Sequence, residues 1–370
     1  MVRREACFIC TSPFQVLGAI SIVAKERMEA DLFLIGTFRD SEIVADRIRK
    51  YSLFNNVYFV DPKIIGIRGK TDNIKKIIFA EGIVNKFLDK NVSYDRYYYS
   101  SRSLLKSALL KVLLDRNPEM KRIIFDEGMG TYSGNGRLLS VSMPRRVLEK
   151  MMRWKLDDPK KTEILAYLPD LVKYEKPFDS CIVHQMPYLD YKGDMREMMR
   201  DLFAIPEDGI IREQCIIFDT KRNETASLSS EQLDILDQCY EKIIHYTGKD
   251  KVILKPHPRS TKPCPDGIGT YPYTGIPMEA LYTFMPDLQD RILISFVSSA
   301  VFTPKILFDK EAVVICLHRL FKGNETSAVF EDIFQKMRGA YRQPERVIAP
   351  NTVEELEEQL QTINSLLKHT

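Results

Sequence analysis

Short apolar runs rich in β-branched residues alternate with amphipathic stretches along most of this chain. Strands of a parallel sheet are buried on both faces and are joined by helices, so this alternation predicts an α/β protein with parallel sheets. In the first half the expected strands are Ala6–Cys10, Asp31–Gly36, Val57–Val60, Tyr97–Ser100 and Arg122–Phe125. In the second half they are Ser180–His184, Gln214–Phe218, Lys251–Lys255, Arg291–Ser295 and Ala312–Cys316.

The helical stretches between these runs have ordinary lengths and caps. They are predicted at Ser41–Tyr51, Asn73–Leu88, Ser103–Asp115, Ser230–Thr247 and Thr352–Lys368. Ser229 and Gln232 have the spacing of a capping box, which marks the start of the fourth. The last helix is a candidate for a crossing back to the first half of the chain.

Two successive α/β regions of similar size predict two domains. A polar stretch with prolines, Pro169–Phe178, separates them. We therefore expect one Rossmann-like domain at 1–175, a second at 176–345, and the C-terminal helix in 346–370. Ligands of such open sheets bind beyond the carboxyl ends of the strands, which predicts a site in a cleft that the two domains face.

The charge balance restricts the partners. The chain has 370 residues, of which 54 are basic and 51 acidic, for a formal net charge of +3. A dedicated nucleic-acid binder carries a clear basic excess, so this class is excluded. No apolar run approaches the roughly 20 residues of a transmembrane helix. The apolar run after Arg3 and Arg4 is too short for a signal peptide, so we expect a cytoplasmic protein.

Two carboxylates, Asp126 and Glu127, follow the expected strand Arg122–Phe125 directly and precede Gly128. Partial burial at a strand end would raise the pKa of a carboxylate toward the range of a general base. The alternative is a plain turn, because Asp and Gly both favour turns.

A basic segment lies at the end of the expected strand Lys251–Lys255. Lys255, His257 and Arg259 alternate with Pro256 and Pro258, and the prolines restrict the backbone. Three basic side chains presented in this way can hold an anion, and His257, protonated or as a hydrogen-bond donor, can stabilise a leaving phosphate. A surface turn with solvated charges is the alternative.

Small hydroxyl residues occupy two further strand ends. Ser298 and Ser299 follow an expected strand and precede a helix, where hydroxyl and backbone N–H groups can bind a phosphate. Thr11 and Ser12 follow the first strand and can line the same cleft. An N-cap or a simple turn explains either pair equally well.

The segment 144–155 combines five cationic side chains with apolar residues and the only tryptophan, Trp154. A basic amphipathic helix of this kind can lie on an anionic membrane surface, here the inner face of the membrane. The alternative is a helix that packs its apolar residues on the protein core.

Taken in order, D-E-G at 126–128, H-P at 257–258 and S-S at 298–299 resemble the three short motifs of bacterial sialyltransferases. The opening CFICTSPFQVLGAI looks like the start of glycosyltransferase family 52, the lipooligosaccharide sialyltransferases. The resemblance covers nearly the whole chain. It implies a GT-B fold, in which two Rossmann-like domains face a central cleft. It also implies an inverting transfer of sialic acid from CMP-sialic acid to a galactose-type hydroxyl of a cell-surface glycan such as lipooligosaccharide.

The resemblance also implies roles for residues of this chain. Asp126 would be the base with Glu127 beside it, His257 would assist the departure of CMP, and Ser298 with Ser299 would hold its phosphate. No cofactor or metal is implied, and the sequence contains no D-x-D. The remaining candidate donor-site residues are Lys255, Pro258, Arg259, Gly128, Thr11 and Ser12. Because members of this family include swapped dimers associated with membranes, a homodimer with a peripheral membrane contact is also implied.

Several alternatives stay open at this point. Asp219, after the strand Gln214–Phe218, is a second candidate for the base. The motifs fit another CMP-nonulosonate transferase or a capsule-polymer transferase equally well. A CDP-glycerol glycerophosphotransferase shares an H-P and paired serines, although no acidic residue follows the serines closely here. A non-catalytic membrane-binding or polymer-binding module is the alternative from a different class.

Overall fold

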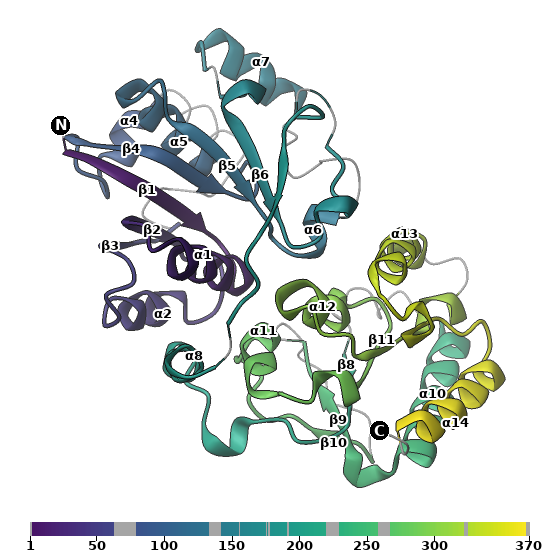
Figure 1. Ribbon diagram of the computed structural model, residues 1–370. Coiled ribbons are helices and arrows are strands. Elements are labelled where there is room, and N and C mark those ends of the chain that lie inside the picture. The colour runs from purple at the N-terminus through teal and green to yellow at the C-terminus, as the bar shows by residue number, and fades with distance from the viewer. Residues whose placement is uncertain are drawn as a thin grey trace. The chain divides into compact units, whose positions relative to one another are not determined.

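Two parallel β-sheets, one in each half of the chain, organise this computed structural model (Figure 1). The structure describes residues 2–62, 79–132, 142–154, 156–174, 176, 178–190, 192–219, 229–257, 267–321 and 325–367. The chain divides into two compact units, Met1–Asp190 and Tyr191–Thr370. The predicted α/β class with two Rossmann-like sheets is confirmed.

The first unit has a seven-stranded sheet in the order β3-β2-β1-β4-β5-β6-β7. Its strands are β1 Val2–Cys10, β2 Ala30–Ile35, β3 Asn56–Val60, β4 Val92–Tyr99, β5 Lys121–Phe125, β6 Thr162–Ala166 and β7 Val183–Gln185. The strand expected at Ser180–His184 is β7, which pairs with β6 and therefore belongs to this first sheet. The polar stretch chosen as the domain boundary thus lies inside the first unit, between two neighbouring strands.

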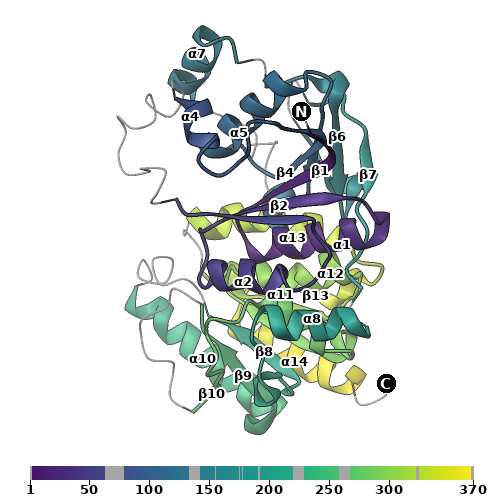
Figure 2. The same cartoon turned by 90° about the vertical axis from the view of Figure 1, so that its left-hand side faces the viewer.

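Helices cover both faces of the first sheet. They are α1 Pro13–Glu26, α2 Ser41–Ile48, α4 Ala80–Val84, α5 Leu104–Arg116, α6 Met129–Tyr132 and α7 Met143–Met151. Helices α1 and α2 lie on one side, and α4 and α5 lie together on the other (Figure 2). The side chains of Cys7, Phe33 and Ile124 pack with Leu109 of α5 in a continuous apolar core on the second side.

The second unit has a six-stranded sheet in the order β10-β9-β8-β11-β12-β13. Its strands are β8 Cys215–Phe218, β9 Val252–Lys255, β10 Gly269–Thr270, β11 Ile292–Ser295, β12 Val313–Cys316 and β13 Val347–Ile348. Its helices are α8 Asp194–Leu202, α10 Ser230–Thr247, α11 Met278–Leu281, α12 Thr303–Phe308, α13 Glu325–Ala340 and α14 Val353–Leu367. The predicted capping box of α10 is present, with both reciprocal hydrogen bonds between Ser229 and Gln232.

The C-terminal helix α14 belongs to the second unit. Its apolar residues Leu356, Leu360 and Ile363 join the core of the second sheet, and the helix lies beside α10 (Figure 1). Lys242 of α10 pairs with Glu357, with 2.6 Å between Nζ and Oε2. The sequence predicted that this helix could cross back to the first domain. Instead, its apolar face packs against the core of the second unit beside α10.

Each sheet contains one point at which the strand order reverses. In the first sheet it lies between β1 and β4, and in the second between β8 and β11. Open parallel sheets bind ligands at the carboxyl ends of the strands beside such a point. The segments that follow β1, β4 and β5 in the first unit, and β8, β9 and β11 in the second, therefore lie where such sheets bind ligands. Within the described ranges, no helix combines the length and apolarity that a membrane crossing requires.

Candidate active site

Asp126 follows β5 directly and is fully buried, with 0% of its surface exposed. Its Oδ1 accepts a hydrogen bond from the Gly128 N–H at 2.7 Å, and its Oδ2 accepts one from the Tyr167 N–H at 3.1 Å. The Tyr132 hydroxyl donates to Oδ2 as well. Burial raises the pKa of Asp126, and these hydrogen bonds oppose the rise. The geometry makes Asp126 a structural group that ties the loop after β5 to the neighbouring chain.

Gly128 has a conformational role in the same loop. Its φ of +95° lies in the region that L side chains rarely adopt. A Cβ there would also lie 3.4 Å from the ring of Phe14. The glycine allows the tight turn in which its own N–H reaches Asp126.

Glu127 is the accessible carboxylate at this strand end. It is half-buried, and burial raises its pKa to about 7 although the nearby charge of Lys106 lowers it. The charge of Asp126 raises this pKa further, and hydrogen bonds from Gln15 and Ser101 lower it. A general base works best when its pKa lies near the working pH, so Glu127 has the properties that the sequence analysis sought in this motif.

Lys106 is the main functional candidate that the sequence analysis missed. It lies in the first turn of α5 and is only 2% exposed. Its Nζ donates to the hydroxyls of Thr11, at 3.3 Å, and Ser101, at 3.1 Å. Burial lowers the pKa of Lys106, and the negative charge of Glu127 raises it. The available signal was a lysine among the apolar residues at the start of a helix that follows a strand.

Thr11 and Ser12 lie at the carboxyl end of β1, where they were expected. The Thr11 hydroxyl and N–H both donate to Oε1 of Gln15, at 2.9 and 2.7 Å. Ser12 caps α1, since its hydroxyl accepts from the Gln15 N–H at 3.3 Å. The structure therefore brings Thr11, Gln15, Lys106 and Glu127 together at the strand-order reversal of the first sheet.

In the second unit, His257 and Asp219 lie at the carboxyl ends of adjacent strands. His257 follows β9 and is half-buried, and Asp219 follows β8. The Asp219 N–H donates to the Lys255 carbonyl at 3.1 Å. Pro258 and Arg259, the other members of the predicted anion clamp, lie outside the described residues.

Lys255 has a different environment from the one predicted. It is the last residue of β9, it is only 4% exposed, and its Nζ lies 4.8 Å from the centre of the Tyr271 ring. Burial lowers its pKa to about 8, while the charge of Glu279 opposes this change. Every residue of β9 is buried, and Lys255 is part of this strand, whereas the sequence predicted a cation presented at the strand end.

Ser298 and Ser299 follow β11, next to β8 across the strand-order reversal of the second sheet. The Ser298 hydroxyl accepts from the Ala300 N–H at 3.3 Å and caps the short 3₁₀ helix Ser299–Phe302, while Ser299 is exposed. Asp219, His257 and Ser298 thus share the carboxyl edge of one sheet. Among the described residues, His, Cys, Asp and Glu side chains nowhere form a group of three or more that could hold a metal ion.

The predicted basic helix is α7 with the turn that follows it. Arg145 and Glu149 fix one of its sides. Arg145 donates to the Ser107 hydroxyl at 2.6 Å, and Glu149 accepts from Arg102 at 2.7 Å. Trp154 is buried in the core of the first unit. The helix therefore attaches to the protein largely by ionic contacts and by its tryptophan.

The opposite side of α7 carries apolar side chains into solvent. Met143, Val147 and Met151 recur at intervals of four residues and are 66%, 52% and 74% exposed. Arg146 and Lys150 beside them are exposed as well. The expected alternative, in which these apolar residues pack on the core, does not hold for this row.

Each unit has polar side chains at the carboxyl ends of its parallel strands: a carboxylate in the first, and an imidazole and hydroxyls in the second. This is the arrangement of α/β enzymes, which form their active sites at that edge of the sheet. The chain belongs to the alpha-2,8-polysialyltransferase (POLYST) family, whose sequence profile matches residues 7–317. The protein is therefore a sialyltransferase, a kind of glycosyltransferase. The predicted sialyltransferase class is confirmed by this match, which is to the polysialyltransferase family and not to family 52.

Comparison with solved structures gives plant glycosyltransferases at low identity. Apo UGT2 of Phytolacca americana has 10% identity and a TM-score of 0.44, with coverage of 99% of this chain and 94% of that one. A UDP-glucosyltransferase from Polygonum tinctorium that glucosylates indoxyl, in complex with 3,4-dichloroaniline, has 10% identity and a TM-score of 0.45, with coverage of 99% and 92%. No curated protein matches the sequence significantly.

Proposed function

We propose that this protein is an inverting, metal-independent sialyltransferase that uses CMP-sialic acid as donor and Glu127 as the general base. The observation that carries the proposal is the accessible carboxylate of Glu127, which accepts a hydrogen bond from Gln15 at a strand end of a chain in a sialyltransferase family. Burial raises the pKa of this carboxyl to about 7. Glu127 takes the role that the motif resemblance gave to Asp126, because the oxygens of Asp126 are occupied inside the protein.

The second unit would serve the donor. Breaking the bond between the sugar and the phosphate leaves negative charge on CMP, which hydrogen-bond donors must stabilise. His257 would assist the departure of CMP, and Ser298 with Ser299 would hold its phosphate. Their shared position at the carboxyl edge of one sheet supports this assignment. The GT-B cleft expected from the sequence stays a prediction.

For the acceptor, we propose the hydroxyl of a terminal sialic acid, following the family description, so that the protein extends a polysialic chain. The alternative is a galactose-type hydroxyl of a lipooligosaccharide. One assay with CMP-sialic acid distinguishes these two acceptors. It compares transfer to an oligosaccharide that ends in sialic acid with transfer to one that ends in galactose.

The decisive experiment measures CMP release and product formation by the purified protein. We expect turnover with CMP-sialic acid, none with CDP-glycerol, and no change on addition of EDTA. His257→Ala should lower transfer at least about 10²-fold, the usual size of an acid–base contribution. Full activity of this variant in the folded state, or turnover of CDP-glycerol alone, would contradict the proposal. Loss of activity in EDTA would contradict the metal-independent mechanism.

The exposed row of α7 supports a peripheral contact with an anionic membrane. Methionine and valine side chains can enter the interface while Arg146 and Lys150 meet acidic headgroups. Vesicles of acidic phospholipid should bind the protein, and Met151→Ser with Val147→Ser should weaken this binding by a few-fold to tenfold. Leu233→Ser, at an exposed apolar residue of α10, is the matched control and should leave it unchanged. The homodimer stays a prediction.

A further inference from the structure

We propose that Gln15 is a positioning residue that holds the carboxylate of Glu127, in a two-armed hydrogen-bond network that starts at the buried ammonium of Lys106. The inference rests on the proposed role of Glu127 as base. Lys106 lies outside the segments that suggested the function, and Gln15 lies in the opening segment, where the resemblance gave it no role.

The first arm runs through the carboxyl end of β1. Lys106 Nζ donates to Thr11 Oγ1 at 3.3 Å, and that hydroxyl donates to Gln15 Oε1 at 2.9 Å. Gln15 Nε2 then donates to Glu127 Oε2 at 3.3 Å. Gln15 lies in the first turn of α1 and is only 3% exposed, so its side chain has little freedom to turn away.

The backbone fixes the orientation of this amide. The N–H of Thr11 donates to Gln15 Oε1 at 2.7 Å, and a backbone N–H can only be a donor. The oxygen of the amide must therefore face Thr11, which leaves the NH₂ group facing Glu127. An NH₂ group donates and cannot accept, so this contact favours the charged form of Glu127.

The second arm runs through the residues after β4. Lys106 Nζ donates to Ser101 Oγ at 3.1 Å, and Ser101 hydrogen-bonds to Glu127. Both arms thus begin at one cation and end at one carboxylate. The charged groups that act on Glu127 are Lys106 from α5 and Asp126 from its own loop, and their effects on its pKa oppose each other.

This arrangement explains how a carboxylate can be shielded enough to have a high pKa and still be oriented. In the described structure, no ion pair within 4.0 Å joins Lys106 directly to Glu127. The hydrogen-bond paths between them run through Thr11 and Gln15 in one arm and through Ser101 in the other. A direct pair would hold the carboxylate permanently charged and make it a weaker base. The neutral donors orient the oxygens while the basicity is kept.

The test is the pH dependence of kcat/KM for CMP-sialic acid in Gln15→Leu, which removes the donor and keeps the size of the side chain. Loss of a hydrogen bond to the charged form should raise the pKa of Glu127. We expect the acid limb of the profile to move up by about one pH unit, with activity about tenfold lower at pH 6.5 and largely recovered at pH 8.5. An acid limb that stays at its wild-type pH, including a loss of equal size at every pH, overturns the proposal.

Two further variants keep the result interpretable. Ser101→Ala removes the other arm at a less buried position, and should move the acid limb in the same direction by a smaller amount. If Gln15→Leu does not fold, an unmoved limb in Ser101→Ala overturns the proposal. Glu127→Gln is measured in parallel. An inactive Glu127→Gln with an unmoved limb in the other variants refutes the positioning role alone, whereas a fully active Glu127→Gln refutes the role of Glu127 as base.

Discussion

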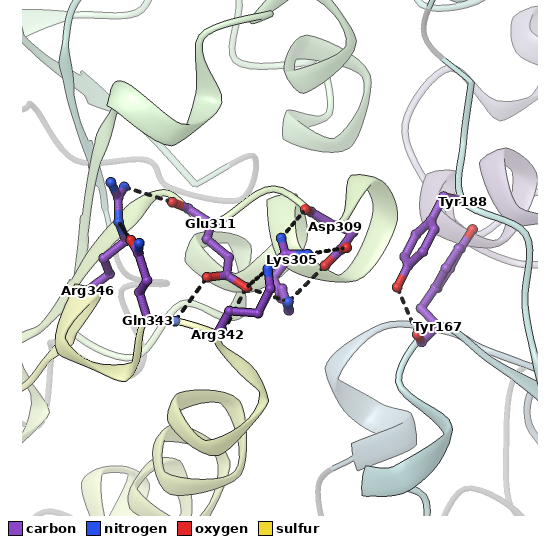
Figure 3. A network of polar contacts seen from close by, with 8 residues as sticks. All are labelled: Tyr167, Tyr188, Lys305, Asp309, Glu311, Arg342, Gln343 and Arg346. Atoms are coloured by element: carbon purple, nitrogen blue, oxygen red, sulfur yellow. Dashed lines mark hydrogen bonds and ion pairs between the residues drawn. The ribbon is translucent and has the colours of Figure 1, made fainter. Parts of the chain in front are cut away.

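Two groups that pair a buried lysine with a glutamate, one in each unit, give the glutamates opposite pKa shifts. In the second unit, Lys305 Nζ lies 2.6 Å from Glu311 Oε1 and 2.8 Å from Asp309 Oδ1 (Figure 3). Burial raises the pKa of Glu311, but its hydrogen bonds and the charge of Lys305 outweigh burial and lower it overall. In the first unit, Lys106 reaches Glu127 through neutral side chains, and the pKa of Glu127 rises to about 7.

The position of each group in its sheet explains the difference. Asp309 and Glu311 precede β12, at the amino edge of the second sheet, where Arg342 and Gln343 also bond to Glu311 (Figure 3). Glu127 follows β5, at the carboxyl edge where α/β enzymes build their sites. The direct ion pair between Lys305 and Glu311 stabilises the fold. Among the described residues, Glu127 makes no direct ion pair with Lys106, so its carboxylate can take up and release a proton near neutral pH.

The largest expected effect is on transfer. Glu127→Gln should lower sialyl transfer by about 10²- to 10⁴-fold, because the base can no longer accept a proton. Glu311→Gln, the matched change at the amino edge, should leave the rate constant of the folded protein unchanged. Initial rates of CMP release at pH 8 compare the two, and similar losses in both variants would remove the distinction between the two groups.

Removing Lys305 from its ion pairs with Asp309 and Glu311 should lower the free energy of unfolding. Lys305→Met leaves Asp309 and Glu311 without their buried cation, and removing one partner of a buried pair typically costs about 3–5 kcal/mol. Urea unfolding followed by circular dichroism measures the change. A loss below about 1 kcal/mol would mean that the network in Figure 3 is as weak as an exposed salt bridge.

The two glutamates should affect stability with opposite signs. The pKa of Glu127 is raised, so folding favours its protonated form and stability falls as the pH rises from its ordinary pKa to about 7. Glu127→Gln should therefore stabilise the protein at pH 8, by about 1–3 kcal/mol. The pKa of Glu311 is lowered, so its contribution is present above its ordinary pKa and is lost as the pH falls through the folded value. Glu311→Gln should therefore destabilise at pH 8. Urea unfolding at pH 8 and pH 5 gives both signs, and equal signs at pH 8 would contradict this account.

A smaller effect is expected at Asp126, which shares the strand end with Glu127. Asp126→Asn keeps the size of the side chain but puts an NH₂ group where a carboxylate oxygen accepts bonds from Gly128 or Tyr167. It should cost about 1–2 kcal/mol of stability and less than tenfold in transfer. A loss of transfer as large as that of Glu127→Gln, in a variant as stable as the wild type, would return the role of base to Asp126.

Much of the fold could be predicted from the sequence, because apolar runs such as Cys215–Phe218 are buried strands with few alternatives. The strand Thr162–Ala166 was not predicted. Ser180–His184, which pairs with it, was assigned to the second sheet, and the expected domain boundary was therefore placed before it. The D-E-G motif predicted two carboxylates directly after a strand, and β5 ends at Phe125, just before them. That Asp126 is the buried carboxylate could not be predicted, because one of the groups that bind it is the N–H of Tyr167, a residue distant in sequence.

The central claim is that Glu127 is the base, and the pH profile of transfer tests it most directly. For the wild-type protein, kcat/KM for CMP-sialic acid should rise with pH along an acid limb centred near pH 7, because Glu127 must lose its proton before it can accept one from the acceptor. The small residual activity of Glu127→Gln should lack this limb. A limb at the same pH in both proteins would show that another group is the base.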